Sequence, residues 1–363
     1  MNSSILGRAI LAALLIPLAA CNTEQRAAQR RADSLRVADS IRVDSLRQDS
    51  VAKAIQRADS IRTDSIRADS VHRADSLARG KRRHSTAVAS LGSTDTVPWP
   101  KLPDPLPGSL LPSHRIVAFY GNPLSRRMGI LGELPPDQML AKLAATAETW
   151  TAADSTTTVI PALHLIVTVA QGLEGRDGMH RLRMTDSLVE RVARWAEARK
   201  WLLFLDIQVG RSTVEAELPR LLPYLERPYV HLALDPEFAM KDGARPGRKI
   251  GTMDASEVNY AIRTLADLVK RKQLPPKILV VHRFTEGMLT NASKIARDPH
   301  VQVVIDMDGF GPPPLKRSTW RHVIQRDPVQ YTGFKLFYKN DKPMLTPAQV
   351  IALYPSPLYI QYQ

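Results

Sequence analysis

The sequence predicts a (β/α)8 barrel of the TIM type over residues 113–363. Two observations lead to this prediction. From His114 to the C-terminus, short apolar runs alternate with amphipathic segments of helical period. Eight apolar runs and seven amphipathic segments fill this part of the chain, and this number and order, over about 250 residues, are typical of such a barrel. A doubly wound open sheet is the alternative, and an apolar strand at the very C-terminus favours the barrel.

The elements are assigned in order along the chain. The predicted strands are RIVAFYG (115–121), TTVIPALHLIV (157–167), WLLFLDIQV (201–209), YVHLALDPE (229–237), KILVVHRF (277–284), VQVVIDMD (301–308), GFKLFYK (333–339) and PLYIQYQ (357–363). The predicted helices lie within 135–150, 184–200, 213–226, 254–272, 285–296, 317–325 and 346–354. Two of them open with a capping residue, since Asp254 precedes ASEVNY and Thr346 precedes Pro347 at the first helical position.

The N-terminus resembles the export signal of a bacterial lipoprotein. Arg8 is followed by the apolar stretch AILAALLIPLAA and then by Cys21, the only cysteine in the sequence. A positive charge, a short apolar core and small residues before a cleavage site are typical of a signal peptide, and the core is too short to span a bilayer comfortably. LAAC at 18–21 resembles a lipobox, which implies removal of residues 1–20 and lipidation of Cys21. Asn22 after the cysteine favours the outer membrane where the cell has one.

Residues 21–84 predict a spacer and not a globular domain. Units such as RADSLR, VADSIR and TDSIR recur every five or six residues. This period gives a helix two thin apolar stripes instead of one broad core-facing stripe. A charged helical rod or loose coiled coil is one interpretation, and a disordered chain is the other, because Asp and Ser are poor helix formers. Residues 85–112, with STDTVPWPKLPDPLPGSLLP, predict a proline-rich, semi-extended linker.

The formal net charge of +14 does not by itself indicate a nucleic-acid partner. We find no helix-turn-helix, zinc-finger or RNA-binding motif. In an exported lipoprotein, a basic surface attracts anionic envelope polymers and lipid head groups. We therefore expect attachment to the membrane through the lipid anchor, a barrel in the periplasm or outside the cell, an envelope glycan or peptidoglycan as partner, and no nucleic acid.

Polar residues end nearly every predicted barrel strand. The active site of such a barrel is built where the carboxyl ends of its strands meet the following loops, so these residues form a candidate site. The catalytic candidates are Glu237, Asp235, Asp206, Asp306 and Asp308. The candidates for substrate binding are Tyr120, Gln208, His282, Lys335, Tyr338 and Gln361.

Asp235 and Glu237 occupy positions i and i+2 of a predicted strand, so we expect their side chains to face the same side. Two carboxylates close together in a partly dry pocket raise the pKa of one of them, which then serves as a general acid on a glycosidic oxygen. Asp306 and Asp308 repeat this spacing. The alternative is turn chemistry, in which Asp235 bonds its own backbone and Pro236 ends the strand.

An Asp-x-Glu at the end of the fourth strand resembles family 18 chitinases and family 25 lysozymes. The resemblance implies that Glu237 is the general acid and that Asp235 orients an acetamido group or stabilises positive charge. The longer family 18 motif, Asp-x-x-Asp-x-Asp-x-Glu, is missing, since His231 stands four residues before Asp235. The strand ends LDIQ, LDPE and DGFG also resemble uncharacterised bacterial lipoproteins, which supports the fold.

The predicted function is a membrane-anchored envelope lipoprotein whose barrel hydrolyses an amino-sugar polymer by carboxylate acid/base catalysis. A non-catalytic lipoprotein that binds a wall glycan is the alternative. A metal-dependent hydrolase is third, because His164 joins His282 and the acids in a set of metal-ligating residue types, without H-x-H or H-E-x-x-H spacing. No G-x-S-x-G or G-x-G-x-x-G motif occurs, and we expect no cofactor and no metal.

Overall fold

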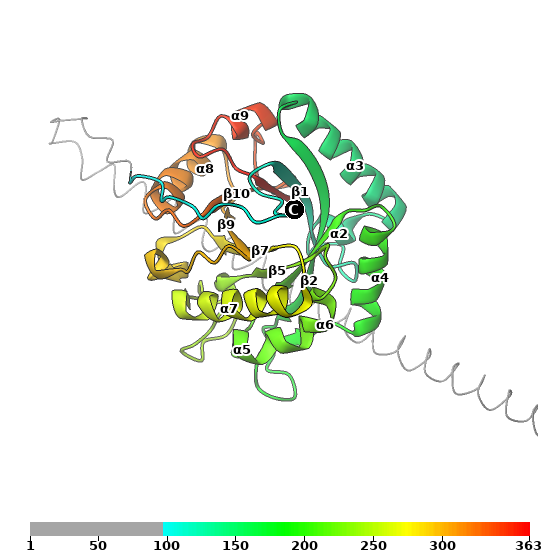
Figure 1. Ribbon diagram of the computed structural model, residues 1–363. Helices are drawn as coiled ribbons and strands as arrows, with labels where there is room; N and C mark the ends of the chain where they lie inside the picture. Colours follow the sequence, from blue (N-terminus) through cyan, green and yellow to red (C-terminus); the bar gives the residue numbers. More distant parts are fainter. Residues whose placement is uncertain (1–96) are drawn as a thin grey trace, which may run out of the picture. The chain divides into compact units, whose positions relative to one another are not determined.

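Residues 97–363, which the computed structural model describes, form a closed barrel of eight parallel strands surrounded by helices (Figure 1). Pairing of β1 with both β2 and β11 closes the ring, which confirms the predicted barrel and excludes the open sheet. Its strands are β1 (His114–Gly121), β2 (Thr158–Ala170), β4 (Leu202–Ile207), β5 (Val230–Leu234), β7 (Lys277–Arg283), β9 (Val301–Met307), β10 (Tyr331–Leu336) and β11 (Tyr359–Tyr362). The signal peptide, Cys21, the repeat and the start of the linker lie outside the described residues.

Side chains alternate between two apolar clusters, because successive residues of a strand point to opposite faces. One cluster fills the space between the strands and the helices, and Val117 and Phe119 of β1 belong to it. The other fills the N-terminal half of the barrel, and Ile116 and Ala118 belong to it together with Phe204. The barrel is therefore packed with side chains up to the level at which the polar strand ends begin.

Most of the predicted helices are present. The long ones are α3 (Pro136–Ala153), α4 (Asp186–Glu197) and α7 (Ala255–Lys272), and shorter ones are α8 (Pro313–Thr319) and α9 (Pro347–Ile351). A further short helix, α2 (Ile130–Glu133), was not predicted. A π-helical turn at Trp320–Gln325 continues α8. Asp254 caps α7 and Thr346 caps α9, each in a capping box that Glu257 or Gln349 completes, so the two predicted caps are confirmed.

Two predicted helices differ from the structure. Residues 213–226 are divided into α5 (Val214–Glu217), a 3-10 helix (Leu218–Leu221) and α6 (Leu222–Leu225), because Pro219 and Pro223 lack the amide hydrogens that a continuous helix needs. The predicted helix 285–296 is wrong. This segment contains a 3-10 turn (Glu286–Met288), β8 (Leu289–Thr290), which pairs with β6 (Met253–Asp254), and a second 3-10 turn (Ala292–Lys294). Between them Asn291 has a left-handed backbone with φ 55, which breaks a helix.

The end of the proline-rich segment covers the N-terminal end of the barrel. Leu111 is fully buried in the inner apolar cluster. The backbone amides of Leu110 and Leu111 both donate to Gln302 Oε1 over 3.1 Å, and Gln302 Nε2 donates to the Leu111 carbonyl over 2.6 Å. Trp99 Nε1 donates to the Gln330 carbonyl over 2.8 Å. The predicted domain boundary at residue 113 thus lies beyond residues that pack against the barrel.

We expect Leu111→Ala to lower the free energy of unfolding by about 2–5 kcal/mol, because it opens a cavity where the barrel is closed. Val97→Ala is the matched control from the same segment, since Val97 is 45% exposed, and we expect it to change stability by less than about 0.5 kcal/mol. Urea unfolding followed by circular dichroism measures both. Equal midpoints for Leu111→Ala and the wild type would show that the segment does not stabilise the barrel.

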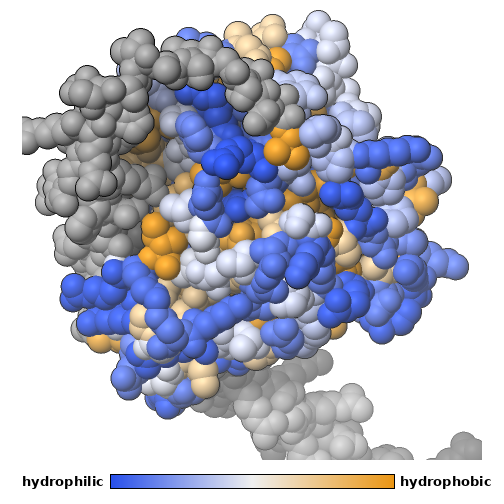
Figure 2. Space-filling view, turned by 90° about the vertical axis from the view of Figure 1, so that its left-hand side faces the viewer, coloured by the Kyte–Doolittle hydropathy of each residue, from blue (hydrophilic) through white to orange (hydrophobic). Residues whose placement is uncertain are grey.

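The surface of the described domain is mainly hydrophilic on the side that Figure 2 shows, with separate hydrophobic spots. Large hydrophobic side chains exposed within residues 97–363 are Val97, Leu173, Met179 and Tyr354. In this part of the chain, no helix combines the length and the apolar character that crossing a membrane requires.

Candidate functional site

A layer of polar side chains lies inside the C-terminal half of the barrel. Five strands contribute their penultimate residue to it, and these are Asp206, His282, Asp306, Lys335 and Gln361. Each lies two positions after a residue that also faces the interior, as the strand period requires. All five are fully buried, and so is His164 from the longer strand β2. We call these six residues the polar layer.

Gly333 leaves room for one member of this layer. It pairs with Asp306 across β9 and β10, and a Cβ atom at position 333 would lie 2.6 Å from Asp306 Oδ1. A side chain at this position therefore requires the carboxylate to move.

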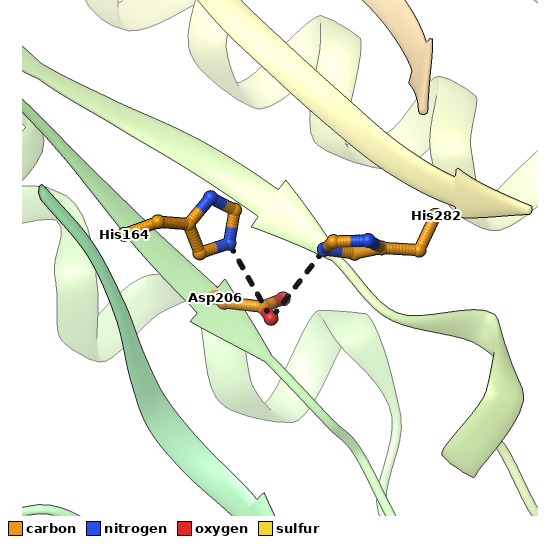
Figure 3. A group of neighbouring side chains, drawn as sticks. All are labelled: His164, Asp206 and His282. Carbon is orange, nitrogen blue, oxygen red and sulfur yellow. Dashed lines mark ion pairs between the residues drawn. The ribbon is translucent and has the colours of Figure 1, made fainter. Parts of the chain in front are cut away.

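Asp206 lies between two imidazole rings (Figure 3). Its Oδ2 is 3.5 Å from His164 Nε2 and 3.6 Å from His282 Nε2. The other ring nitrogen of His282, Nδ1, is 3.1 Å from Asp308 Oδ2 and 3.4 Å from Asp306 Oδ2. The ring of His282 thus joins carboxylates from β4 and β9, two strands that are not neighbours in the barrel.

Burial and these contacts shift the pKa values in opposite directions. Burial lowers the pKa of His164 to about 4, although Asp206 opposes the shift. Burial would also lower the pKa of His282, but Asp206, Asp306 and Asp308 together raise it well above its usual value. The pKa of Asp206 is lowered, because the two imidazoles outweigh its burial. Burial raises the pKa of Asp306 despite its contact with His282.

Four residues predicted to bind substrate form contacts within the site. Lys335 Nζ is 3.0 Å from Asp308 Oδ1 and 3.8 Å from the centre of the Tyr120 ring. Gln208 Nε2 donates to the Tyr120 hydroxyl over 3.2 Å and to Asp235 Oδ2 over 3.1 Å. Gln361 Nε2 is 3.1 Å from His164 Nδ1. These side chains hold one another in place, so each affects where the others lie.

Asp235 and Glu237 do not share a strand face. Strand β5 ends at Leu234, three residues before the end of the predicted strand. Asp235 caps a 3-10 turn (Pro236–Phe238), and its Oδ1 accepts from the Glu237 amide over 3.2 Å. The expected shared facing is therefore wrong, because the strand alternation has ended, and Asp235 shows the turn chemistry that was the alternative. Asp235 is fully buried, whereas Glu237 is partly exposed.

Tyr338 lies outside the barrel interior. Its ring stacks on Tyr362 with centres 5.1 Å apart and meets the edge of Phe119 at 6.4 Å. Lys142 of α3 lies over the same ring, 4.1 Å from its centre. Tyr338 therefore belongs to the layer between the strands and α3, and the structure does not bring it to the polar layer.

One neighbour of the site, Tyr359, is not among the predicted site residues. Its hydroxyl is 2.6 Å from His164 Nδ1. The signal was present, because Tyr359 stands two residues before Gln361 on the last strand and so faces the same interior. His231 also lies inside the barrel, but its Nδ1 accepts from the Ile278 amide over 3.1 Å in the apolar half.

Three residues of the polar layer have the geometry of a metal-ligand set. His164, Asp206 and His282 each present a ligand atom, and these atoms lie within 4.8 Å of one another. The sequence showed no metal spacing motif, because the three ligands come from three different strands.

Comparisons with known proteins give no family. No family model matches the chain, and no curated protein matches it. Among solved structures, a ruminal GH26 endo-beta-1,4-mannanase is similar at 12% identity with a TM-score of 0.34. The match covers 69% of this chain and 59% of the mannanase chain, which is less than two thirds of that protein. The barrel fold of this chain therefore rests on its own strand pairing.

Proposed function

We propose that this protein is an envelope hydrolase, anchored to the membrane through a lipid on Cys21, whose barrel cleaves an amino-sugar polymer. The observation that supports a reaction site is the polar layer inside the carboxyl ends of the barrel strands. Burying charged groups costs free energy that an apolar core avoids, and buried groups with strongly shifted pKa values gather at functional sites. In a barrel of this type, the carboxyl ends of the strands are the end where reactions take place.

Glu237 is the proposed general acid. It lies in the turn directly after the fourth barrel strand, and it is partly exposed, whereas Asp206, Asp235 and Asp306 are fully buried. Among the catalytic candidates, Glu237 is therefore the residue most accessible to a polymer at the surface. The bond from Gln208 to Asp235 fixes the start of this turn. The residues that follow, Ala239 to Lys241, line a surface cavity of about 330 Å³.

The buried acids have a supporting role in this proposal. Cleavage of a glycosidic bond passes through an oxocarbenium-like transition state, which carries positive charge. Fixed carboxylates in a site that excludes water stabilise such charge without reorganisation. Asp308, directly after β9, supplies negative charge to the end of the barrel at which Glu237 lies.

Glycan binding without turnover is the second candidate, and burial favours it. The catalytic candidates other than Glu237 are at most 6% exposed, so a polymer does not touch them in this conformation. On this alternative, the polar layer fixes the loops of a binding surface and takes no part in a reaction.

Glu237→Gln separates the two candidates. We expect the variant to fold and to bind glycan while losing about 10²–10⁴-fold in turnover, because the amide has no proton to transfer. The assay incubates the protein with peptidoglycan and chitin oligomers and follows the products by mass spectrometry. Glu286→Gln is the control, since Glu286 is an exposed acid in the loop after β7, and it should retain full activity. Binding that is equal for the wild type and Glu237→Gln, with turnover by neither, favours the binding protein.

A further inference from the structure

The geometry around Asp206 fits a metal ion better than it fits direct hydrogen bonds. Asp206 Oδ2 lies 3.5 Å from His164 Nε2 and 3.6 Å from His282 Nε2, whereas N–H···O bonds have lengths of about 2.7–3.2 Å. A tetrahedral zinc ion with bonds of about 2.0–2.1 Å separates its ligand atoms by about 3.3 Å. These two separations are close to those that a shared ion requires, and all three ligand atoms lie within 4.8 Å of one another.

The ligand atoms have no other partner. Within residues 97–363, His164 Nε2, His282 Nε2 and both carboxylate oxygens of Asp206 are buried and accept or donate no hydrogen bond. Buried polar atoms are nearly always satisfied by protein, water or an ion. Four such atoms converging from three strands, in the arrangement of Figure 3, indicate an ion at their centre.

The outer nitrogen of each ring faces groups of the kind that orient metal-binding histidines. His282 Nδ1 makes no hydrogen bond within the part of the chain that the structure describes, but it lies 3.1 and 3.4 Å from carboxylate oxygens of Asp308 and Asp306. These carboxylates attract a proton to Nδ1, which leaves Nε2 for a metal. His164 Nδ1 faces the Tyr359 hydroxyl and the Gln361 amide. Gln361 Oε1 has no hydrogen-bond partner among the described residues, so turning this amide over lets Oε1 accept a proton from His164 Nδ1.

We propose that His164, Asp206 and His282 bind one divalent transition-metal ion, with Zn²⁺ as the first candidate. Imidazole and carboxylate ligands suit zinc and its neighbours, whereas Mg²⁺ and Ca²⁺ prefer oxygen ligands alone. Three protein ligands leave one position for water, which is the arrangement of catalytic and not of structural zinc sites. An ion there supplies a water of lowered pKa. This inference goes beyond the proposed glycan hydrolysis, since the ion is bound whether or not Glu237 transfers a proton.

Metal binding by the full chain tests the proposal. The protein is stripped with a chelator and titrated with ZnCl₂ by calorimetry, and bound zinc is counted by mass spectrometry after desalting. We expect one equivalent in the wild type. Loss of an outer hydrogen-bond partner weakens metal binding about 10–100-fold. Asp206→Asn and His282→Gln change the ligands themselves and should weaken zinc binding more than that. His231→Gln is the matched control, because it removes a buried histidine of the same barrel that bonds only to the Ile278 amide, and it should bind zinc as the wild type does.

A second measurement needs no variant, in case the substitutions impair folding. Co²⁺ added to the stripped wild type should give the visible absorption of a four-coordinate site, and Zn²⁺ should remove it by competition. A wild type that retains no zinc after titration and desalting, or variants that all bind like the wild type, would overturn the proposal. The glycan assay is independent, because a metal site without turnover leaves this inference intact and refutes only the proposed function.

Discussion

Replacing Lys316 by methionine is expected to lower the free energy of unfolding by about 3–5 kcal/mol, the usual effect of removing one partner from a buried ion pair. Lys316 and Asp341 have side chains that are 1% and 0% exposed, and Lys316 Nζ lies 2.8 Å from Asp341 Oδ2. Nζ also donates to the carbonyls of Gly309 and Lys335 over 2.9 and 2.6 Å. Methionine fills the volume but leaves a carboxylate and two carbonyls buried without this donor.

A double-mutant cycle tests this explanation. Asp341 also accepts from the amides of Gly311 and Phe337, and asparagine retains one oxygen for such bonds. We therefore expect Lys316→Met with Asp341→Asn to cost less than the sum of the single substitutions. Lys339→Met is the control, because Lys339 is 65% exposed in its pair with Glu133 and should cost less than about 1 kcal/mol. Strictly additive effects would show that charge pairing is not the reason.

The barrel could be predicted because each of its strands can be recognised from a short stretch of sequence. Each strand is a short apolar run, and eight such runs that alternate with helical segments are compatible with few folds. The error at 285–296 has a local cause as well. Met288, Leu289 and Ile295 have a spacing that fits a helix, but Gly287 and Asn291 interrupt a helix there.

The sequence predicted in part which residues form the site, but it did not predict which of their side chains contact one another. Polar strand ends brought Asp206, His282 and Asp306 to one layer, as the sequence indicated. The contact of Asp206 with His282 joins strands that are two apart, and it depends on how the strands tilt and stagger when the barrel closes. No single strand encodes that stagger. The ligand set therefore appears only in the folded chain.

The prediction of Tyr338 at the site conflicts with the period of a β-strand. Lys335 and Tyr338 are three residues apart in the predicted strand 333–339, so a strand period of two sends them to opposite faces of that strand. Expecting both at the site was inconsistent with Lys335 facing the interior. In the structure β10 ends at Leu336, and Tyr338, in the turn after it, stacks on Tyr362 outside the barrel interior.

Glu217 joins the helical side of the barrel to β3 (Arg181–Arg183), the strand that pairs antiparallel with the end of β2. It is fully buried and accepts two hydrogen bonds from Arg183, of 2.7 and 2.9 Å, and one of 2.8 Å from Arg181. Ser212 Oγ donates a fourth bond over 2.7 Å. Burial alone would raise the pKa of Glu217, but the bonds from Arg183, Ser212 and Arg181 outweigh it and hold the pKa below its usual value.

Glu217→Gln is therefore expected to destabilise the domain by about 3 kcal/mol at pH 7, the lower end for a buried pair, because Arg183 is 41% exposed and can turn to solvent. A carboxyl group whose pKa is lowered by folding stabilises the fold above its unfolded pKa, and this contribution is lost as the pH falls through the folded pKa. The difference between wild type and variant should thus be full at pH 7 and shrink below the usual value of 4.5. Urea unfolding at pH 7, 5 and 3 measures it, with exposed Glu215 of the same helix changed to Gln as the control. A difference that stays constant down to pH 3 would mean that Glu217 acts through its shape and not through its charge.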